Sequence, residues 1–118
     1  MSTAEVRSKL LEGAAIIYPG PYLNQLRGER IESRCQELLA DGFRRLVINF
    51  EDTELINSIG ISILLGVIEA VNEMNGTLVL SNLNDSNRDL FEMLGLLGHV
   101  GVEETEEGAL ERIGTLSH

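Results

Sequence analysis

The run from Leu46 to Phe50 constrains the fold more than any other part of the sequence. It reads Leu-Val-Ile-Asn-Phe, and consecutive apolar and β-branched residues of this kind are typical of a strand that is buried on both faces. A second apolar run follows at Thr77–Leu83. Helical patterns, with apolar residues three and four positions apart, extend from about Leu23 to Leu39 and from Asn57 to about Met74. Because strands alternate with helices, we expect a largely parallel sheet with right-handed crossovers.

The remaining segments complete the predicted order of elements. Val6–Leu11 and Ala14–Tyr18 are short strand patterns, and Glu12-Gly13 between them suits a hairpin turn. The later elements are a helix opened by a capping box at Ser86–Asp89 and ending at Gly95, a short strand within Gly98–Val102, and a helix from Thr105 to about Ile113. Together they predict one α/β domain over residues 1–118, with a mostly parallel sheet of four to five strands and about four helices.

An excess of acidic residues limits the classes of partner. The chain has 19 acidic and 9 basic residues, which gives a formal net charge of −10. Nucleic acids and anionic membrane surfaces require clustered lysine and arginine, so we expect neither as a partner. A protein partner with a basic patch fits this charge, and so does a charge that serves solubility alone.

The expected compartment is the cytoplasm. Cys35 is the only cysteine, so the chain cannot form an internal disulfide. The first residues show no signal-peptide pattern, and the apolar stretch Ile59–Ile68 is shorter than the roughly 20 residues that a membrane span needs.

The sequence offers little catalytic chemistry. His99 and His118 have no second ligand at metal-binding spacing, and Cys35 lies on the apolar face of a predicted helix. No glycine-rich nucleotide loop is present, and the acidic residues form no pair in different environments. A response-regulator receiver would need acidic residues after its first strand, where this chain has Tyr18-Pro19-Gly20. We therefore expect a protein that is not an enzyme and that has no catalytic residue, cofactor or metal.

The start of the second predicted helix allows two interpretations. In the structural one, Asn57 or Ser58 is the N-cap, whose side-chain oxygen accepts a hydrogen bond from a free backbone N–H. In the functional one, Ser58 is also a phosphorylation site, because a phosphate at a helix N-terminus meets free N–H groups and the positive end of the helix dipole.

From Leu46 to about Leu110 the sequence resembles the STAS domain of bacterial anti-sigma factor antagonists and sulfate transporters. The central pattern of that family is an apolar strand, an acidic loop and Asp-Ser-Ser/Thr-Gly-Leu-Gly at the start of a helix. The matching segments here are Asn57-Ser58-Ile59-Gly60-Ile61-Ser62, Asn75–Asn82, Arg88–Leu96 and Glu107-Gly108-Ala109-Leu110. This chain has Asn57 and Ile59 where the family has an acid and a hydroxyl residue, and Asn24 where the family has a second acid.

The resemblance implies a STAS-like fold and a role in partner switching and transcription regulation. Ser58 would be phosphorylated by an anti-sigma factor, a serine kinase with the fold of histidine-kinase-type ATPases. The unmodified chain would bind that kinase and so release a sigma factor. The expected partner-binding residues are Asn57, Ser58, Ile59, Gly60, Ile61, Ser62, Ile63 and Asn24. A STAS scaffold that is not phosphorylated and a small ligand-binding domain are the alternatives, and homodimerisation is left open.

The second predicted helix carries more apolar residues than one face needs. Ile61, Leu64, Leu65 and Ile68 form one apolar face, whereas Ile63, Val67 and Met74 lie away from it. A helix that is apolar on more than one side either packs between layers or offers a surface to a partner. The second case predicts a groove lined by Ile59, Ile63 and Val67, with Tyr22 at its rim.

Overall fold

A five-stranded sheet in the order β1-β2-β4-β6-β7 forms the centre of the computed structural model, which describes residues 6–114. Its strands are β1 (Arg7–Leu11), β2 (Ala14–Tyr18), β4 (Arg45–Asn49), β6 (Thr77–Ser81) and β7 (Gly101–Glu103). β1 and β2 pair antiparallel, and the other three pairs are parallel. The expected α/β class and the mostly parallel sheet are confirmed.

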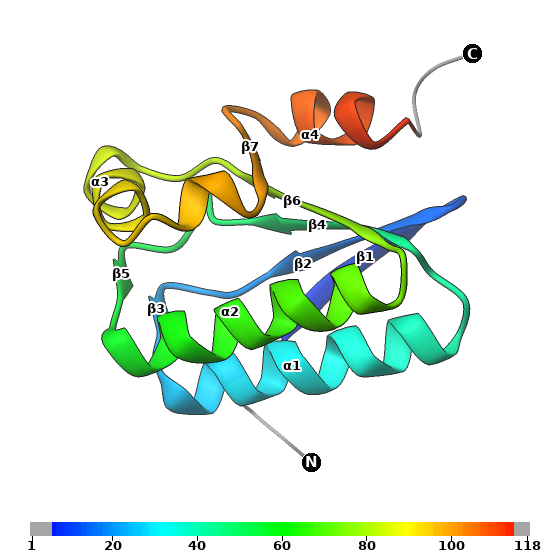
Figure 1. The fold of residues 1–118 in the computed structure, drawn as a ribbon, viewed down its shortest axis with the longest axis horizontal. Coiled ribbons are helices and arrows are strands. Elements are labelled where there is room, and N and C mark those ends of the chain that lie inside the picture. Colours follow the sequence, from blue (N-terminus) through cyan, green and yellow to red (C-terminus); the bar gives the residue numbers. More distant parts are fainter. Residues whose placement is uncertain (1–5, 115–118) are drawn as a thin grey trace.

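Helices cover both faces of this sheet (Figure 1). They are α1 (Gln25–Ala40), α2 (Ser58–Glu73), α3 (Asp85–Met93) and α4 (Glu106–Ile113), and a short 3-10 turn, η1, spans Leu96–Gly98. The neighbouring helices α1 and α2 lie on one face and α4 lies on the other (Figure 1). Leu46 and Ile48 belong to the larger core under α1 and α2, whereas Val47 belongs to the smaller core under α4. The run that starts at Leu46 is therefore buried on both sides, as its composition predicts.

Two further strands, absent from the sequence-based prediction, form a second small sheet. β3 (Tyr22–Leu23) precedes α1, β5 (Leu55–Ile56) precedes α2, and the two pair in parallel. With only two residues each, they are too short to show the alternation by which strands are found in a sequence. They connect the segments that enter the two neighbouring helices.

The structure corrects two predicted boundaries. The cap of α3 is Asn84, whose Oδ1 accepts a hydrogen bond from the N–H of Asn87 at 2.8 Å, and Ser86 lies inside the first turn. The last strand begins only at Gly101, because Leu96–Gly98 form η1 and His99 and Val100 lie in the turn and bend that follow it. The predicted Thr105 cap is confirmed, since its Oγ1 accepts from the N–H of Gly108 at 3.0 Å.

None of the helices within residues 6–114 has the length and apolar character required to span a membrane.

Candidate functional site

The N-terminal ends of α1 and α2 are held side by side at one end of the molecule (Figure 1). The β3–β5 pairing sets Tyr22 beside Leu55 and Leu23 beside Ile56. The N–H of Asn57 donates to the carbonyl oxygen of Leu23 at 3.0 Å, which continues the ladder into the start of α2. Two helix N-termini, with their unpaired N–H groups, therefore face the same region of solvent.

The two strand-to-helix segments repeat the same arrangement. Each has an exposed residue, a buried residue, an asparagine cap and two exposed helical residues, in the sequences Tyr22-Leu23-Asn24-Gln25-Leu26 and Leu55-Ile56-Asn57-Ser58-Ile59. Asn24 Oδ1 accepts from the N–H of Arg27 at 3.0 Å, and Asn57 Oδ1 accepts from the N–H of Gly60 at 2.7 Å. Both asparagines therefore have a structural role. Of the two candidate caps of α2, Asn57 and Ser58, the structure shows that Asn57 is the cap.

Ser58 is free of that structural role. Its side chain is exposed at the first position of α2, and it makes no hydrogen bond to any described residue. The backbone N–H groups of Ser58 and Ile59 also lack a partner among the described residues. A negatively charged group on Ser58 would thus lie beside unpaired N–H donors at the positive end of a 16-residue helix.

Exposed apolar side chains lie at the same two helix starts as Ser58. Tyr22, Leu26, Leu55 and Ile59 are 45%, 50%, 64% and 50% exposed. The Tyr22 hydroxyl lies 3.3 Å from Asn57 Nδ2, which fixes the ring beside the start of α2. We call Ser58 and these four side chains the helix-start surface. Apolar groups gathered on a surface in this way are typical of sites that bind other proteins.

The eight predicted partner-binding residues fall into different places. Asn24, Asn57, Ser58, Ile59 and Ser62 reach the surface at or near this end of the molecule. Gly60 and Ile61 are buried, so they position the turn instead of facing solvent. Ile63 packs on Gly28 of α1, where a Cβ built on that glycine would lie 3.0 Å from Ile63 Cδ1.

The groove predicted along α2 is wrong. Val67 is only 2% exposed and belongs to the larger core, so the second apolar side of α2 packs against the rest of the protein. Leu26 and Leu55 are exposed at this end of the molecule but are not among the predicted residues. No signal in a single sequence would have selected them, because their position follows from the β3–β5 pairing.

Polar contacts with α3 hold the loop that leads to β5. Thr53 is 2% exposed, and its Oγ1 donates to the carbonyl oxygen of Gly20 at 2.7 Å. Its own carbonyl oxygen accepts from Asn87 Nδ2 at 3.2 Å and from Asn84 Nδ2 at 3.4 Å. The backbone before the helix-start surface is thus connected both to the chain before β3 and to the start of α3.

A separate polar cluster lies at the start of α4. Glu106 accepts hydrogen bonds from the Tyr18 hydroxyl at 2.7 Å and Asn49 Nδ2 at 2.9 Å, and it forms an ion pair with Lys9 Nζ at 3.1 Å. Partial desolvation raises the pKa of Glu106, but the hydrogen bonds from Tyr18, Asn49 and Lys9 outweigh it, so the net pKa is lowered. These contacts hold α4 against the sheet.

Glu106→Gln is expected to lower the free energy of unfolding by about 1 kcal/mol at pH 7, since charge-assisted hydrogen bonds become neutral ones. The lowered pKa means that this contribution is present above about pH 4.3, the pKa of an unperturbed glutamate, and is lost as pH falls through the folded pKa. Urea unfolding at pH 7 and at acidic pH measures the difference. Glu107→Gln removes the exposed neighbouring charge from the same helix turn, and an equal effect there would contradict this assignment.

The remaining candidate chemical groups lie elsewhere. Burial raises the pKa of the Cys35 thiol to about 12, which keeps it protonated, as expected for a core residue. His99 is exposed after η1, and His118 lies outside the described residues.

Comparisons with known proteins give a consistent result. A model of the STAS domain family matches residues 6–109. BtrV of Bordetella bronchiseptica, provisionally named an anti-sigma factor antagonist, is 27% identical over 99 residues, which cover 84% of this chain and 85% of that protein.

Two solved structures have a similar fold. A protein of Thermotoga maritima, provisionally named an anti-sigma factor antagonist, superposes with a TM-score of 0.84 at 18% identity, over 92% of this chain and 93% of that one. The Bacillus cell fate determinant SpoIIAA in its phosphorylated form superposes with a TM-score of 0.72 at 22% identity, over 92% and 98% of the two chains.

Proposed function

The chain belongs to the STAS domain family, and on that premise we propose that it is an anti-sigma factor antagonist controlled by phosphorylation of Ser58. The partner is an anti-sigma factor that is also a serine kinase, with the fold of histidine-kinase-type ATPases. The unmodified chain binds this kinase through the helix-start surface and so releases a sigma factor. The protein acts by binding, in the cytoplasm, and not as an enzyme.

One observation carries this proposal: Ser58 exposes its hydroxyl at two paired helix starts that also expose four apolar side chains. The apolar groups provide contact area for a protein partner, and the hydroxyl provides a modifiable group within that area. The relative named as an anti-sigma factor antagonist, and a similar fold known in a phosphorylated form, support the same role.

Phosphate on Ser58 would act mainly on binding and leave the fold intact. Asn57 caps the helix, so modification of Ser58 breaks no hydrogen bond among the described residues. The free N–H groups of the first turn would stabilise the phosphate. The modification would add a charge of roughly −1.5 to −2 to an apolar contact surface. A partner that binds there would have to displace the water around the phosphate, and this desolvation would weaken binding.

Incubation of the chain with its cognate kinase and ATP tests the site. We expect one added phosphate by intact-protein mass spectrometry in the native chain and in Ser62→Ala, and none in Ser58→Ala. Ser62 is an exposed serine on the same helix and is the matched control. The phosphorylated form should bind the kinase roughly tenfold or more weakly by calorimetry, a change of about 1.4 kcal/mol.

The alternative outcomes of this experiment are distinct. A phosphate that persists in Ser58→Ala contradicts the assigned site. Absence of binding between the unmodified chain and the kinase contradicts the proposed partner. Because the Ser58 side chain is exposed and makes no hydrogen bond to a described residue, Ser58→Ala should change the free energy of unfolding by less than about 0.5 kcal/mol, so lost phosphorylation would not reflect misfolding.

A scaffold that is never phosphorylated is the second candidate. It is favoured by the departure of this chain from the family pattern at Asn57 and Ile59. In the structure Asn57 caps α2, and Ile59 is an exposed apolar side chain. In that case the native chain and Ser58→Ala bind the partner equally well, and ATP adds no phosphate to either.

A further inference from the structure

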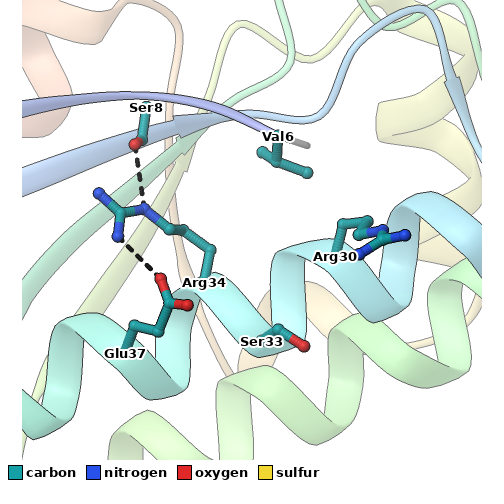
Figure 2. A pocket seen from close by; sticks show the side chains of 6 residues that line it. All are labelled: Val6, Ser8, Arg30, Ser33, Arg34 and Glu37. Atoms are coloured by element: carbon teal, nitrogen blue, oxygen red, sulfur yellow. Dashed lines mark hydrogen bonds and ion pairs between the residues drawn. The ribbon is translucent and has the colours of Figure 1, made fainter. Parts of the chain in front are cut away.

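A cavity of about 390 Å³ opens between β1 and α1 (Figure 2). Its volume lies within the roughly 300–1,000 Å³ range of small-molecule sites. The lining residues are Val6, Ser8, Arg30, Ser33, Arg34 and Glu37. Val6 supplies one apolar wall, and all the other lining side chains are polar or charged.

This cavity is separate from the helix-start surface. Gly28 of α1 packs against Ile63 of α2, and Arg30 follows it by two positions. Two residues correspond to about 200° of rotation around a helix, so Arg30 lies on the side of α1 that faces away from α2. A ligand in this cavity would not cover Ser58.

Arg34 presents several hydrogen-bond donors at one end of the cavity. Arg34 Nε donates to Ser8 Oγ at 3.1 Å and its Nη1 lies 3.0 Å from Glu37 Oε1 (Figure 2). A guanidinium has five N–H donors, so most of those on Arg34 are still available. The Ser8 oxygen acts as an acceptor here, which leaves its own proton free to be donated.

The charge of the cavity is positive despite the acidity of the whole chain. Glu37 balances Arg34, but Arg30 has no ion-pair or hydrogen-bond partner for its side chain among the described residues. Arg30 and Arg34 are four positions apart on one helix face, a spacing at which like charges repel. In Figure 2 the two guanidinium groups point toward opposite ends of the cavity, so an anion there would lie between two positive charges and would accept directed hydrogen bonds from Arg34.

We propose that this cavity binds the phosphate or carboxylate group of a small organic anion. Arg30 supplies the unbalanced charge, and Arg34, oriented by Ser8 and Glu37, supplies directed donors. Ser8 and Ser33 contribute hydroxyl donors at the cavity wall. This inference goes beyond the proposed function, because it adds a ligand site on a different face of the protein.

Titration of ¹⁵N-labelled protein with inorganic phosphate, and separately with malonate, at constant ionic strength tests the site. We expect saturable shifts of the amide signals of Ser8, Arg30, Ser33 and Arg34 with at least one of the two probes. The probe that binds more tightly identifies whether a phosphate or a carboxylate group fits better. Shifts that increase linearly without saturation for both probes would overturn the proposal.

Two substitutions should change the affinity in opposite directions. Arg30→Ala should weaken binding roughly tenfold or more, since the unbalanced positive charge of the cavity is lost without a change in the hydrogen bonds of the fold. Glu37→Gln should tighten it several-fold, because it removes a negative charge and frees Arg34. Arg88→Ala, at an exposed arginine of α3, makes the same change in net charge outside the cavity. Equal weakening by Arg88→Ala and Arg30→Ala would show nonspecific attraction and would refute the site.

Discussion

Gly60→Ala is expected to lower the free energy of unfolding by about 3 kcal/mol, at the upper end of the range for overpacking. A Cβ on Gly60 would lie 2.5 Å from the carbonyl oxygen of Leu23 and 3.0 Å from the Cγ atom of the Leu23 side chain. Neither group can move freely, because Leu23 is fully buried and its carbonyl oxygen accepts the N–H of Asn57. The first turn of α2 would therefore have to move away from β3. Urea unfolding measures the loss.

Gly66→Ala is the matched control for this prediction. Gly66 lies in the same helix, and a Cβ there would have no neighbour within 4 Å. The greater helix propensity of alanine should raise the free energy of unfolding by about 0.5–1 kcal/mol. A similar change in both variants would show that helix propensity, and not the contact with Leu23, determines the effect at Gly60.

Phe91→Ala is expected to cost about 4 kcal/mol of unfolding free energy. Phe91 is fully buried, and its ring meets that of Phe50 edge-on at a centroid distance of 6.1 Å. Phe50 directly follows β4, so this contact packs α3 against the start of the loop that leads to β5. Truncation leaves a cavity in the larger core and weakens the support of the loop that leads to Ser58. Thermal or urea unfolding gives the magnitude.

Met93→Ala provides the comparison for that substitution. Met93 belongs to the same helix and is 76% exposed, so its truncation should change the free energy of unfolding by less than about 0.5 kcal/mol. If Phe91→Ala and Met93→Ala had equal effects, the contribution of Phe91 would come from helix formation and not from its contact with Phe50.

Patterns that extend over several residues predicted most of the fold. The apolar run at Leu46 required burial on both faces, and the structure covers it with helices on both sides. The hairpin turn at Gly13 and the cap at Thr105 follow from local backbone requirements, namely a positive φ of 84° at Gly13 and a side-chain acceptor for Gly108 N–H. Such requirements depend only on neighbouring residues, which is why a single sequence reveals them.

The missed features depend on contacts between distant segments. The apolar pattern of α2 allows either burial on two sides or a groove at Val67, and only the contacts decide: α2 packs against both the sheet and α1, so Val67 is buried. At the start of α3, Asn84, Asp85 and Ser86 are all residue types that can cap a helix. The helix begins at Asp85, so Asn84 occupies the cap position and Ser86 lies in the first turn. Leu26 and Leu55 became part of the candidate site only through the β3–β5 pairing.

That pairing also determines when, during folding, the helix-start surface can exist. Tyr22 and Leu55 are paired neighbours, yet all of α1 and β4 lies between them in the chain. Closing a loop of this length has an entropic cost that must be offset by native contacts made elsewhere. A peptide that contains only the Ser58 segment would lack Tyr22 and Leu26. A partner that requires both halves of the surface would therefore recognise the folded protein and not an isolated peptide from either half.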